Sequence, residues 1–200
     1  MSAPATVPVP EHLRMPATPV LETSRLVLRP IRESDTAAAQ HAFDDWEVVK
    51  YLSDSVAWPL PPGNAEVAMA DTLAKMASGA RCTWALTLKD GGDELIGRID
   101  LWADDGESRD QRGFWLARAF WGRGLMTEAA ERVTEWSFVD LGWPRLWLCN
   151  AEANVASQRV KEKQGARLTD RAPRRYVYGE GVRVTWLLTR EAWLVRRSVG

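Results

Sequence analysis

The chain has 200 residues, 46% of them hydrophobic, and its 26 Lys and Arg residues nearly balance its 27 Asp and Glu residues, giving a net charge of -1. Length and composition are those of an ordinary globular protein, so we expect a single folded domain. The near-zero charge excludes a global field that would draw the protein onto nucleic acid or an anionic membrane. An anionic ligand therefore has to be bound locally.

The two cysteines, Cys82 and Cys149, lie far apart and show neither a CxxC nor a Cys/His spacing. This predicts neither a disulfide framework nor a metal site. No apolar run approaches the roughly 18 to 20 residues that span a bilayer, and the N-terminus lacks the basic and apolar regions of a signal peptide. We therefore expect a cytoplasmic protein that does not enter a membrane.

The first 20 residues contain five prolines among small residues. Such a composition does not sustain helical hydrogen bonding and buries little surface. We expect residues 1–20 to form a Pro-rich flexible arm and residues 21–200 to form the single domain.

The first half of the domain is expected to contain one strand, two helices and a hairpin. In chain order these are a strand over residues 26–31, a helix capped by Ser34 or Asp35 and reaching Phe43, a helix over 64–76 that Gly79 ends, and strands over 83–88 and 95–102. The turn signal Asp-Gly-Gly-Asp at residues 90–93 joins the last two strands.

The second half contains the clearest helix, because its apolar residues recur at intervals of three and four. In chain order we expect a strand over residues 113–117, this helix from Leu125 to Val139 with Gly142 as its end, a strand over 145–149, a short helix from near Asn154 to Gly165, and strands around Tyr176 and over 184–188. Strands outnumber helices and are mixed with them, so the fold class is α+β, with helices on both faces of a mainly antiparallel sheet.

The turn before the long helix is a candidate anion site. The first N–H groups of a helix are unpaired, and they lie at the positive end of the helix dipole. Gly122 and Gly124 allow a tight turn and a close approach of a phosphate, and Arg123 adds positive charge. Neither GxxxxGK[ST] nor GxGxxG is present, so a bound phosphate belongs to another cofactor. The alternative is a turn without a ligand.

The residues of this turn also carry a family resemblance. The string FWGRGLMTEA at residues 120–129, preceded by GFWLA at 113–117, resembles the acetyl-CoA-binding motif of the GNAT N-acetyltransferases, and most resembles the Rim-type branch that acetylates N-termini of ribosomal proteins. A second match, NVAS at 154–157 followed by EKQGA at 162–166, is similar to the Asn-x-x-Ser and Glu-Lys-x-Gly-aromatic signature of that branch. The resemblance covers residues 21 to 193, and it implies a GNAT-like mixed, mainly antiparallel sheet of six to seven strands.

The resemblance implies where acetyl-CoA is bound. In the family, the pantetheine arm lies in a V between two splayed strands and pairs with strand backbone; here Leu116 and Ala117 would offer those groups. Asn154 would hydrogen-bond the pantetheine, although an Asn at this place also serves as a plain helix cap. The pyrophosphate would be held by the backbone amides of Trp121, Gly122, Arg123, Gly124, Leu125, Met126 and Thr127.

Direct attack of an amine on the thioester requires a proton donor for the thiolate and a base for the amine. Ser157, one turn into its helix, is the first candidate donor and is also expected to contact the cofactor, and Tyr176 is the second. Asp100 and Glu47 are candidate bases. For all four residues an ordinary structural role is the alternative.

We therefore expect an acetyl-CoA-dependent N-acetyltransferase that acts without a metal on a primary amine, either a protein N-terminus or a small molecule. Transfer of a larger acyl group such as succinyl stays open, as do a homodimer and a CoA-binding sensor or interaction module with little turnover. A basic cluster that includes Arg174, near Tyr176, raises nucleic-acid binding as a third class, but the balanced charge favours a solvated hairpin.

Overall fold

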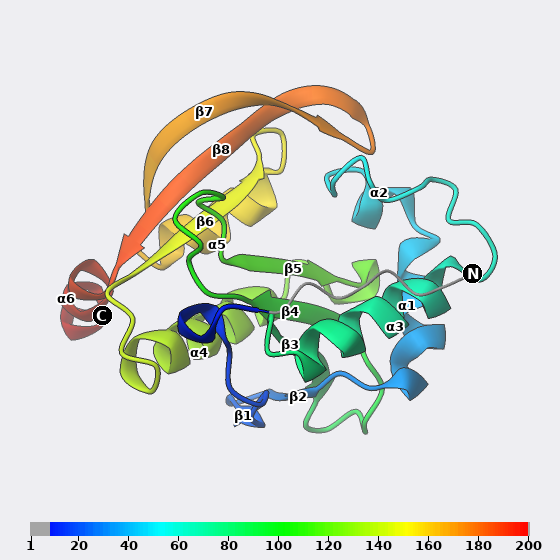
Figure 1. The fold of residues 1–200 in the computed structure, drawn as a ribbon, viewed down its shortest axis with the longest axis horizontal. Coiled ribbons are helices and arrows are strands. Elements are labelled where there is room, and N and C mark those ends of the chain that lie inside the picture. The colour runs from blue at the N-terminus through cyan, green and yellow to red at the C-terminus, as the bar shows by residue number, and fades with distance from the viewer. Residues whose placement is uncertain (1–8, 200) are drawn as a thin grey trace.

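The computed structural model describes residues 9–199, and its chain combines eight strands with six α-helices (Figure 1). The strands are β1 Leu21–Glu22, β2 Leu26–Pro30, β3 Cys82–Leu88, β4 Gly97–Leu101, β5 Arg112–Leu116, β6 Arg145–Ala151, β7 Arg167–Tyr176 and β8 Gly179–Thr189. The helices are α1 Thr36–Phe43, α2 Trp46–Val49, α3 Asn64–Ala77, α4 Leu125–Val139, α5 Val155–Lys163 and α6 Arg190–Val199, with short 3-10 turns η1 Glu11–Leu13, η2 Glu33–Asp35 and η3 Arg118–Phe120.

The predicted α+β class with a mainly antiparallel sheet is confirmed, and the strands divide into two sheets. One sheet has five strands in the order β1-β2-β3-β4-β5, and the other has three in the order β6-β8-β7. Every strand pair within each sheet is antiparallel. The long β7–β8 hairpin arches over one end of the molecule (Figure 1).

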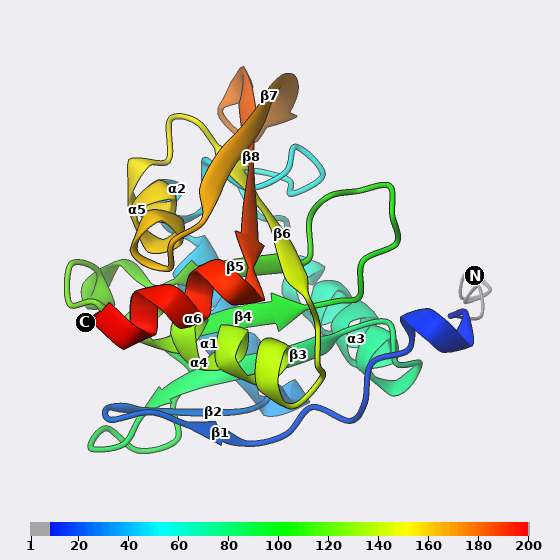
Figure 2. The same cartoon turned by 90° about the vertical axis from the view of Figure 1, so that its left-hand side faces the viewer.

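Helices cover both faces of the five-stranded sheet, as the alternation along β3 requires. Trp84 and Leu86 point into the main core, where α4 packs, and Trp84 meets Trp136 of α4 edge to face at 5.3 Å. Ala85, between them, points to the opposite face and packs with Met69 of α3. Figure 2 shows α3 and α4 on either side of the strands. The burial of these large aromatic side chains supplies much of the stabilisation of the core.

The described part of the predicted flexible arm, residues 9–20, packs against the domain. Met15 is 5% exposed, and the carbonyl of Pro19 accepts a 2.7 Å hydrogen bond from the indole of Trp84. The only helical structure in this stretch is the short 3-10 turn η1, and the carbonyls of Pro16 and Pro19 accept bonds from the side chains of Cys82 and Trp84 on β3. This stretch is therefore bound to the sheet rather than loose. Residues 1–8 lie outside the described residues.

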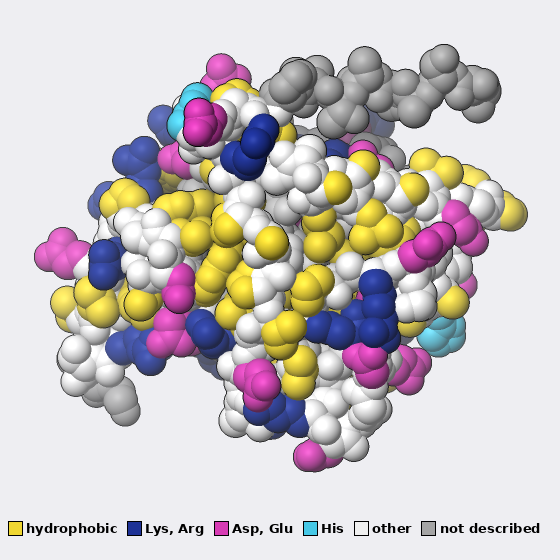
Figure 3. Space-filling model, turned by 60° about the horizontal axis from the view of Figure 1, so that its bottom comes forward, with side chains coloured by type: hydrophobic (Ala, Val, Ile, Leu, Met, Phe, Trp, Pro, Cys, Tyr) yellow, Lys and Arg dark blue, Asp and Glu magenta, His cyan; other side chains and the backbone are white. Residues whose placement is uncertain are grey.

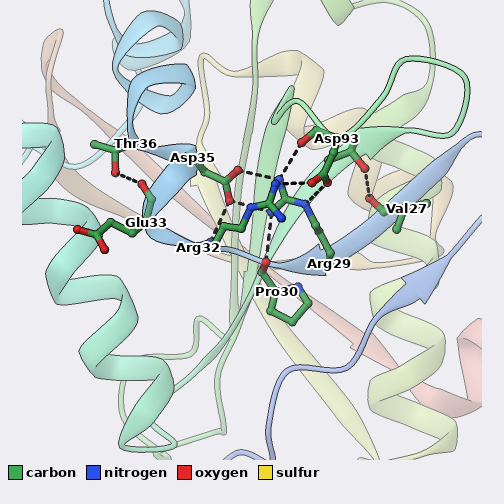
Figure 4. Close-up of polar contacts among 9 residues, drawn as sticks. Val27, Arg29, Pro30, Arg32, Glu33, Asp35, Thr36 and Asp93 are labelled. Atoms are coloured by element: carbon green, nitrogen blue, oxygen red, sulfur yellow. Dashed lines mark hydrogen bonds and ion pairs between the residues drawn. The ribbon is translucent and has the colours of Figure 1, made fainter.

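A half-buried arginine, Arg29, joins β2 to the start of α1 and to the β3–β4 turn (Figure 4). Arg29 donates to both carboxylate oxygens of Asp35, at 2.8 and 2.7 Å. It also contacts the carboxylate of Asp93, which Arg32 contacts as well. Ser34 or Asp35 was predicted to cap α1. Asp35 stands at the N-cap position, but its carboxylate accepts from Arg29 and from the backbone N–H of Arg32, and not from an N–H of the helix.

Charges of both signs are mixed on the face shown in Figure 3, where hydrophobic side chains gather in the middle. That face therefore offers no extensive surface of one charge. None of the helices in the described range is long and apolar enough to cross a bilayer.

Candidate active site

The two sheets meet at one point and then separate. The backbone N–H of Gln111 donates to the carbonyl of Trp147 (2.9 Å), and the side-chain carbonyl of Gln111 accepts from the backbone N–H of Trp147 (2.9 Å). Beyond this point β5 continues in the first sheet and β6 in the second, so a V opens between them (Figure 1). Splayed strands were expected here, and they leave backbone groups without strand partners.

The ladder between β4 and β5 determines which of those groups face the V. The N–H of Ala117 donates to the carbonyl of Ile96 (2.9 Å), so that residue bonds toward β4. Because direction alternates along an antiparallel strand, the N–H and C=O groups of Phe114 and Leu116 point away from β4 and into the V.

Two backbone predictions need correction at this strand. Ala117 was expected to offer main-chain groups to pantetheine, but its N–H bonds to β4 and its carbonyl accepts from Phe120. The carbonyl of Leu116 faces the V but accepts a 2.7 Å bond from the indole of Trp121. The N–H of Leu116 and both groups of Phe114 are therefore the strand groups that remain for a ligand. The role of the Phe114 backbone was missed because the pairing of β5 with β4 decides which residues point their backbone groups into the V, and sequence alone does not give that register.

A cavity of about 830 Å³ occupies the V, which is within the size range of small-molecule sites. It is lined by residues from β5, the following turn, β6, α5, the loop after α2 and the β7–β8 hairpin. Among the predicted residues it brings together Leu116, Trp121, Gly122, Gly124, Met126, Thr127, Asn154, Ser157, Tyr176 and Glu47.

The glycine turn, residues 121–127, lies at one end of this cavity. Gly122 and Gly124 have φ of +72° and +76°, a conformation that favours glycine. The first bond of α4 runs from the N–H of Glu128 to the carbonyl of Gly124 (3.1 Å). Within the described part of the chain, the N–H groups of residues 122–127 donate to no protein group. The turn thus presents six successive free donors at the positive end of a helix.

Arg25 and Glu128 stabilise the conformation of the glycine turn. Arg25 binds the carboxylate of Glu128 and donates to the carbonyl of Arg123 at 2.9 Å. Burial opposes ionisation of Glu128, but hydrogen bonds from Thr23, Arg25 and Ser24 outweigh it and lower the pKa of Glu128 to about 2. The carboxylate is therefore ionised at neutral pH, next to the helix N-terminus where a negative charge is stabilising.

The opposite wall is the first turn of α5. Asn154 caps the helix, since its side-chain oxygen accepts from the N–H of Ser157 (3.0 Å). Ser157 is buried but lines the cavity, and its Oγ accepts a 2.9 Å bond from the Nζ of Lys161. Asn154 and Ser157 thus face the V from one helix terminus, as the family motif implied.

The loop after α2 and the tip of the β7–β8 hairpin form a third wall of the cavity, called here the roof. The N–H groups of Val177 and Tyr178 donate to the carbonyls of Leu52 and Lys50, both at 3.1 Å, so the loop after α2 is bonded to the hairpin tip. Tyr176 lies beneath this roof. Its hydroxyl is 3.5 Å from the carbonyl of Val182, and burial raises the pKa of Tyr176 to about 12.

The predicted base Asp100 lies outside the cavity. The residue is 7% exposed, and its side chain binds Arg98 and Thr83 on the face of β4 toward α3. One carboxylate oxygen therefore already has two strong partners, and the residue anchors the sheet. Glu47 does line the cavity, where it pairs with Lys50 at 2.7 Å.

Sequence analysis missed three ionisable residues around the V: Arg112 and Lys161, which are buried, and Asp110, which is half-buried. Asp110 lines the cavity, its Oδ1 has no partner among the described residues, and burial raises its pKa. Burial likewise lowers the pKa of Arg112 to about 10. Arg112 donates to Gln164 and Thr134, which accounts for two of its nitrogens.

Within residues 9–199 no His, Cys, Asp or Glu cluster suited to a metal ion is found.

Known proteins share this architecture. The family model described as acetyltransferase (GNAT) domain matches residues 25–167. The uncharacterised N-acetyltransferase YoaA of Bacillus subtilis (strain 168) is 28% identical over 169 residues, which is 82% of this chain and 90% of YoaA.

Solved structures extend the comparison at the level of the fold. RimL, a ribosomal L7/L12 alpha-N-protein acetyltransferase solved in complex with coenzyme A, superposes with a TM-score of 0.72 at 15% identity, over 87% of this chain and 99% of RimL. The ribosomal-protein-S5-alanine acetyltransferase from Vibrio fischeri gives a TM-score of 0.70 at 14% identity, over 87% of this chain and 98% of that protein.

Proposed function

This chain belongs to the GNAT acetyltransferase domain family and is an N-acetyltransferase, and we propose that it moves the acetyl group of acetyl-CoA to a primary amine by direct attack. The observation that carries the proposal is the run of six free N–H groups at residues 122–127, at the end of a cavity that continues between β5 and β6. Such donors at a helix N-terminus suit a diphosphate.

The remaining groups fit the rest of the donor. Phe114 and Leu116 offer backbone groups along the V for the amides of pantetheine, and an N–H on the same strand edge suits the oxyanion that forms when the amine attacks. On α5, the side chain of Asn154 supports the arm and the hydroxyl of Ser157 faces the sulfur that leaves. Direct attack needs no covalent enzyme intermediate, because positioning supplies much of the rate.

The amine has to be neutral to attack, and a carboxylate in the cavity aids its deprotonation. Asp110 and Glu47 both line the cavity. Asp110 suits the role better, since one of its oxygens has no partner among residues 9–199 and burial raises its pKa, whereas Glu47 is paired with Lys50.

The acceptor is proposed to be a protein N-terminus or a small-molecule amine. The protein acceptor is supported by the likeness to RimL and to the Vibrio fischeri enzyme, whose names state ribosomal-protein substrates. A cytoplasmic location and a homodimer stay predictions.

Binding and turnover of the full chain test the proposal. Calorimetry should detect binding of acetyl-CoA, and a thiol-release assay should detect free CoA only after an amine is added. The acceptor panel should contain peptides with the N-termini of ribosomal proteins, polyamines and aminoglycosides, and succinyl-CoA should serve as a second donor. Binding without release on every acceptor would indicate a sensor module, and absence of binding would contradict the proposal.

A further inference from the structure

Lys161 is a buried cation without an ionic partner. The residue is 1% exposed and lies on α5 one turn beyond Ser157, and no carboxylate of the described residues lies within 4 Å of its Nζ. Its Nζ lies 2.9 Å from the Oγ of Ser157, 3.4 Å from the carbonyl oxygen of the same residue and 5.2 Å from the centre of the Phe114 ring. Burying an ammonium group without a counter-ion is destabilising, so packing alone does not account for this residue.

Burial and the charged groups around Lys161 bring its pKa close to neutral pH. Burial, followed by the positive charge of Arg112 on β5, lowers the pKa of Lys161 to about 7, and Asp110 and Cys149 partly oppose this change. On α4, Glu131 acts on Arg112 rather than directly on the lysine. At neutral pH the ammonium and the amine are therefore both populated.

The protonated lysine sets the direction of the Ser157 hydroxyl. An ammonium group only donates, so the Oγ of Ser157 accepts from Nζ, and the hydroxyl proton has to point elsewhere. Ser157 lines the cavity, whereas Lys161 does not. The free direction for the hydroxyl proton is therefore toward the bound substrate, and the charge behind Oγ makes that proton a better donor.

We propose that Lys161 is a positioning residue that supplies, through the Ser157 hydroxyl, the proton taken up by the departing CoA thiolate. This inference rests on the proposed function. As the carbon–sulfur bond breaks, a new S–H bond forms with the Ser157 proton while the Oγ–H bond is restored from Nζ. Lys161 is left as a neutral amine and regains a proton from solvent after CoA leaves.

The relay agrees with the acidities involved. A thiol has a pKa of about 8.5 and a serine hydroxyl is far less acidic, so serine alone does not protonate a thiolate readily. The buried ammonium, with its pKa near 7, is the stronger acid and completes the transfer. When Lys161 is neutral, its nitrogen accepts a hydrogen bond from the Ser157 hydroxyl instead, and the hydroxyl proton then points away from the cavity.

The experiment compares kcat of wild type, Lys161→Met, Ser157→Ala and the double variant between pH 5.5 and 9, with acetyl-CoA and amine saturating. We expect Lys161→Met to lower kcat about 10- to 100-fold below pH 7 and to leave the Kd for acetyl-CoA within about twofold. The difference should shrink above pH 8, because wild-type Lys161 is then neutral. Lys75→Met, the same change on the exposed surface of α3, should follow the wild-type profile.

The double variant shows whether Lys161 acts through Ser157. It should be no slower than Ser157→Ala alone, since the lysine has no route to the sulfur without the hydroxyl. A double variant that loses the product of the two single effects would overturn the inference, as would a Lys161→Met profile identical to that of wild type. Lys161→Gln, which keeps a donor but no charge, should lose the same pH dependence and serves if the methionine variant does not fold. A wild type that neither binds acetyl-CoA nor releases CoA contradicts the proposed function instead.

Discussion

Arg25 and Glu128, 103 residues apart in sequence, form a charge-assisted contact in which the Nε of Arg25 donates to Oε2 of Glu128 at 2.7 Å. The same guanidinium donates to the carbonyl of Arg123, so one side chain connects the first turn of α4 to the glycine turn. The N-terminal strand region thereby helps to fix the conformation of the glycine turn, far along the chain.

Glu128→Gln should lower the free energy of unfolding at pH 7 by about 1 kcal/mol, since the pair is partly exposed. The folded-state pKa of Glu128, about 2, lies below its ordinary value of 4.5, so its contribution is present above pH 4.5 and is lost as pH falls toward 2. Denaturant unfolding of both proteins between pH 3 and 7 checks this. Glu66→Gln, which changes an exposed acid in the first turn of α3, is the control. An equal loss of stability in this control would show that Glu128 acts through the helix dipole and not through its pair with Arg25.

Gly122→Ala should weaken binding of acetyl-CoA at least tenfold, because a methyl group would project where the phosphate approaches. Gly142 is the matched control: its φ is +70°, and a Cβ at either glycine meets nothing within 4 Å in the protein itself. Both alanines should therefore cost a similar conformational strain of about 1 kcal/mol. Calorimetric Kd values and unfolding curves for the two variants separate strain from ligand contact; equal Kd values would contradict a diphosphate at this turn.

Lys161→Met should be more stable than wild type at pH 7, by on the order of 1–4 kcal/mol, because the buried charge is removed. The folded-state pKa of Lys161, about 7, lies below its ordinary 10.5. Between these values the unfolded chain binds more protons, so wild-type stability rises with pH across this window and the gap to the variant narrows. Guanidinium unfolding of both proteins at pH 7 and 9.5 measures this difference in stability. A variant that is less stable at pH 7 would show that the ammonium is satisfied where it lies.

Ser157→Ala and Tyr176→Phe distinguish the two candidate proton donors. Burial has made the phenol of Tyr176 a weaker acid, and its hydroxyl faces a backbone carbonyl, so Tyr176→Phe should change kcat less than about threefold. Ser157→Ala should lower kcat about 10- to 100-fold with little change in the Kd for acetyl-CoA. Thiol release at saturating substrates measures both, and the reverse order would assign the role to the tyrosine.

Asp110→Asn should lower kcat about 100-fold while the chain still binds acetyl-CoA. The wild-type rate should fall as pH falls through the raised pKa of Asp110, and the variant should lack this limb. Asp100→Asn is the comparison: it should destabilise the fold by about 3 kcal/mol, since Arg98 loses its partner, and leave kcat of the folded protein unchanged. If only Asp100→Asn slows turnover, the base has been assigned to the wrong carboxylate.

Local signals predicted the elements that carry the site. The glycines and the apolar spacing of α4 specify a turn and a helix within one continuous stretch, and the Asn154 cap is likewise read from neighbouring residues. Two short elements, β1 and α2, and the C-terminal helix α6 were missed. Helix α6 is held by Trp193, which packs edge to face on Phe138 of α4, a contact that sequence alone does not reveal.

The errors at the site come from burial and register. Lys161 stands four residues after Ser157, a spacing that places both on one side of a helix, but a lysine followed by Glu162 and Lys163 is typical of a solvated surface. Asp100 lies within β4 and Asp110 just before β5, and only the folded chain shows that Asp100 binds Arg98 on the side of α3 and that Asp110 lines the cavity.

The contact between Gln111 and Trp147 gives the two sheets a pivot. From Gln111 to Leu116 the strand extends roughly 17 Å, so a tilt of ten degrees at the pivot would shift the far end by roughly 3 Å, about the reach of one hydrogen bond. Helix α4, which packs on β1, β2 and β4 and also meets α5, braces both arms against such a tilt. A cavity-forming substitution on this helix would therefore loosen the grip on a ligand that it never touches.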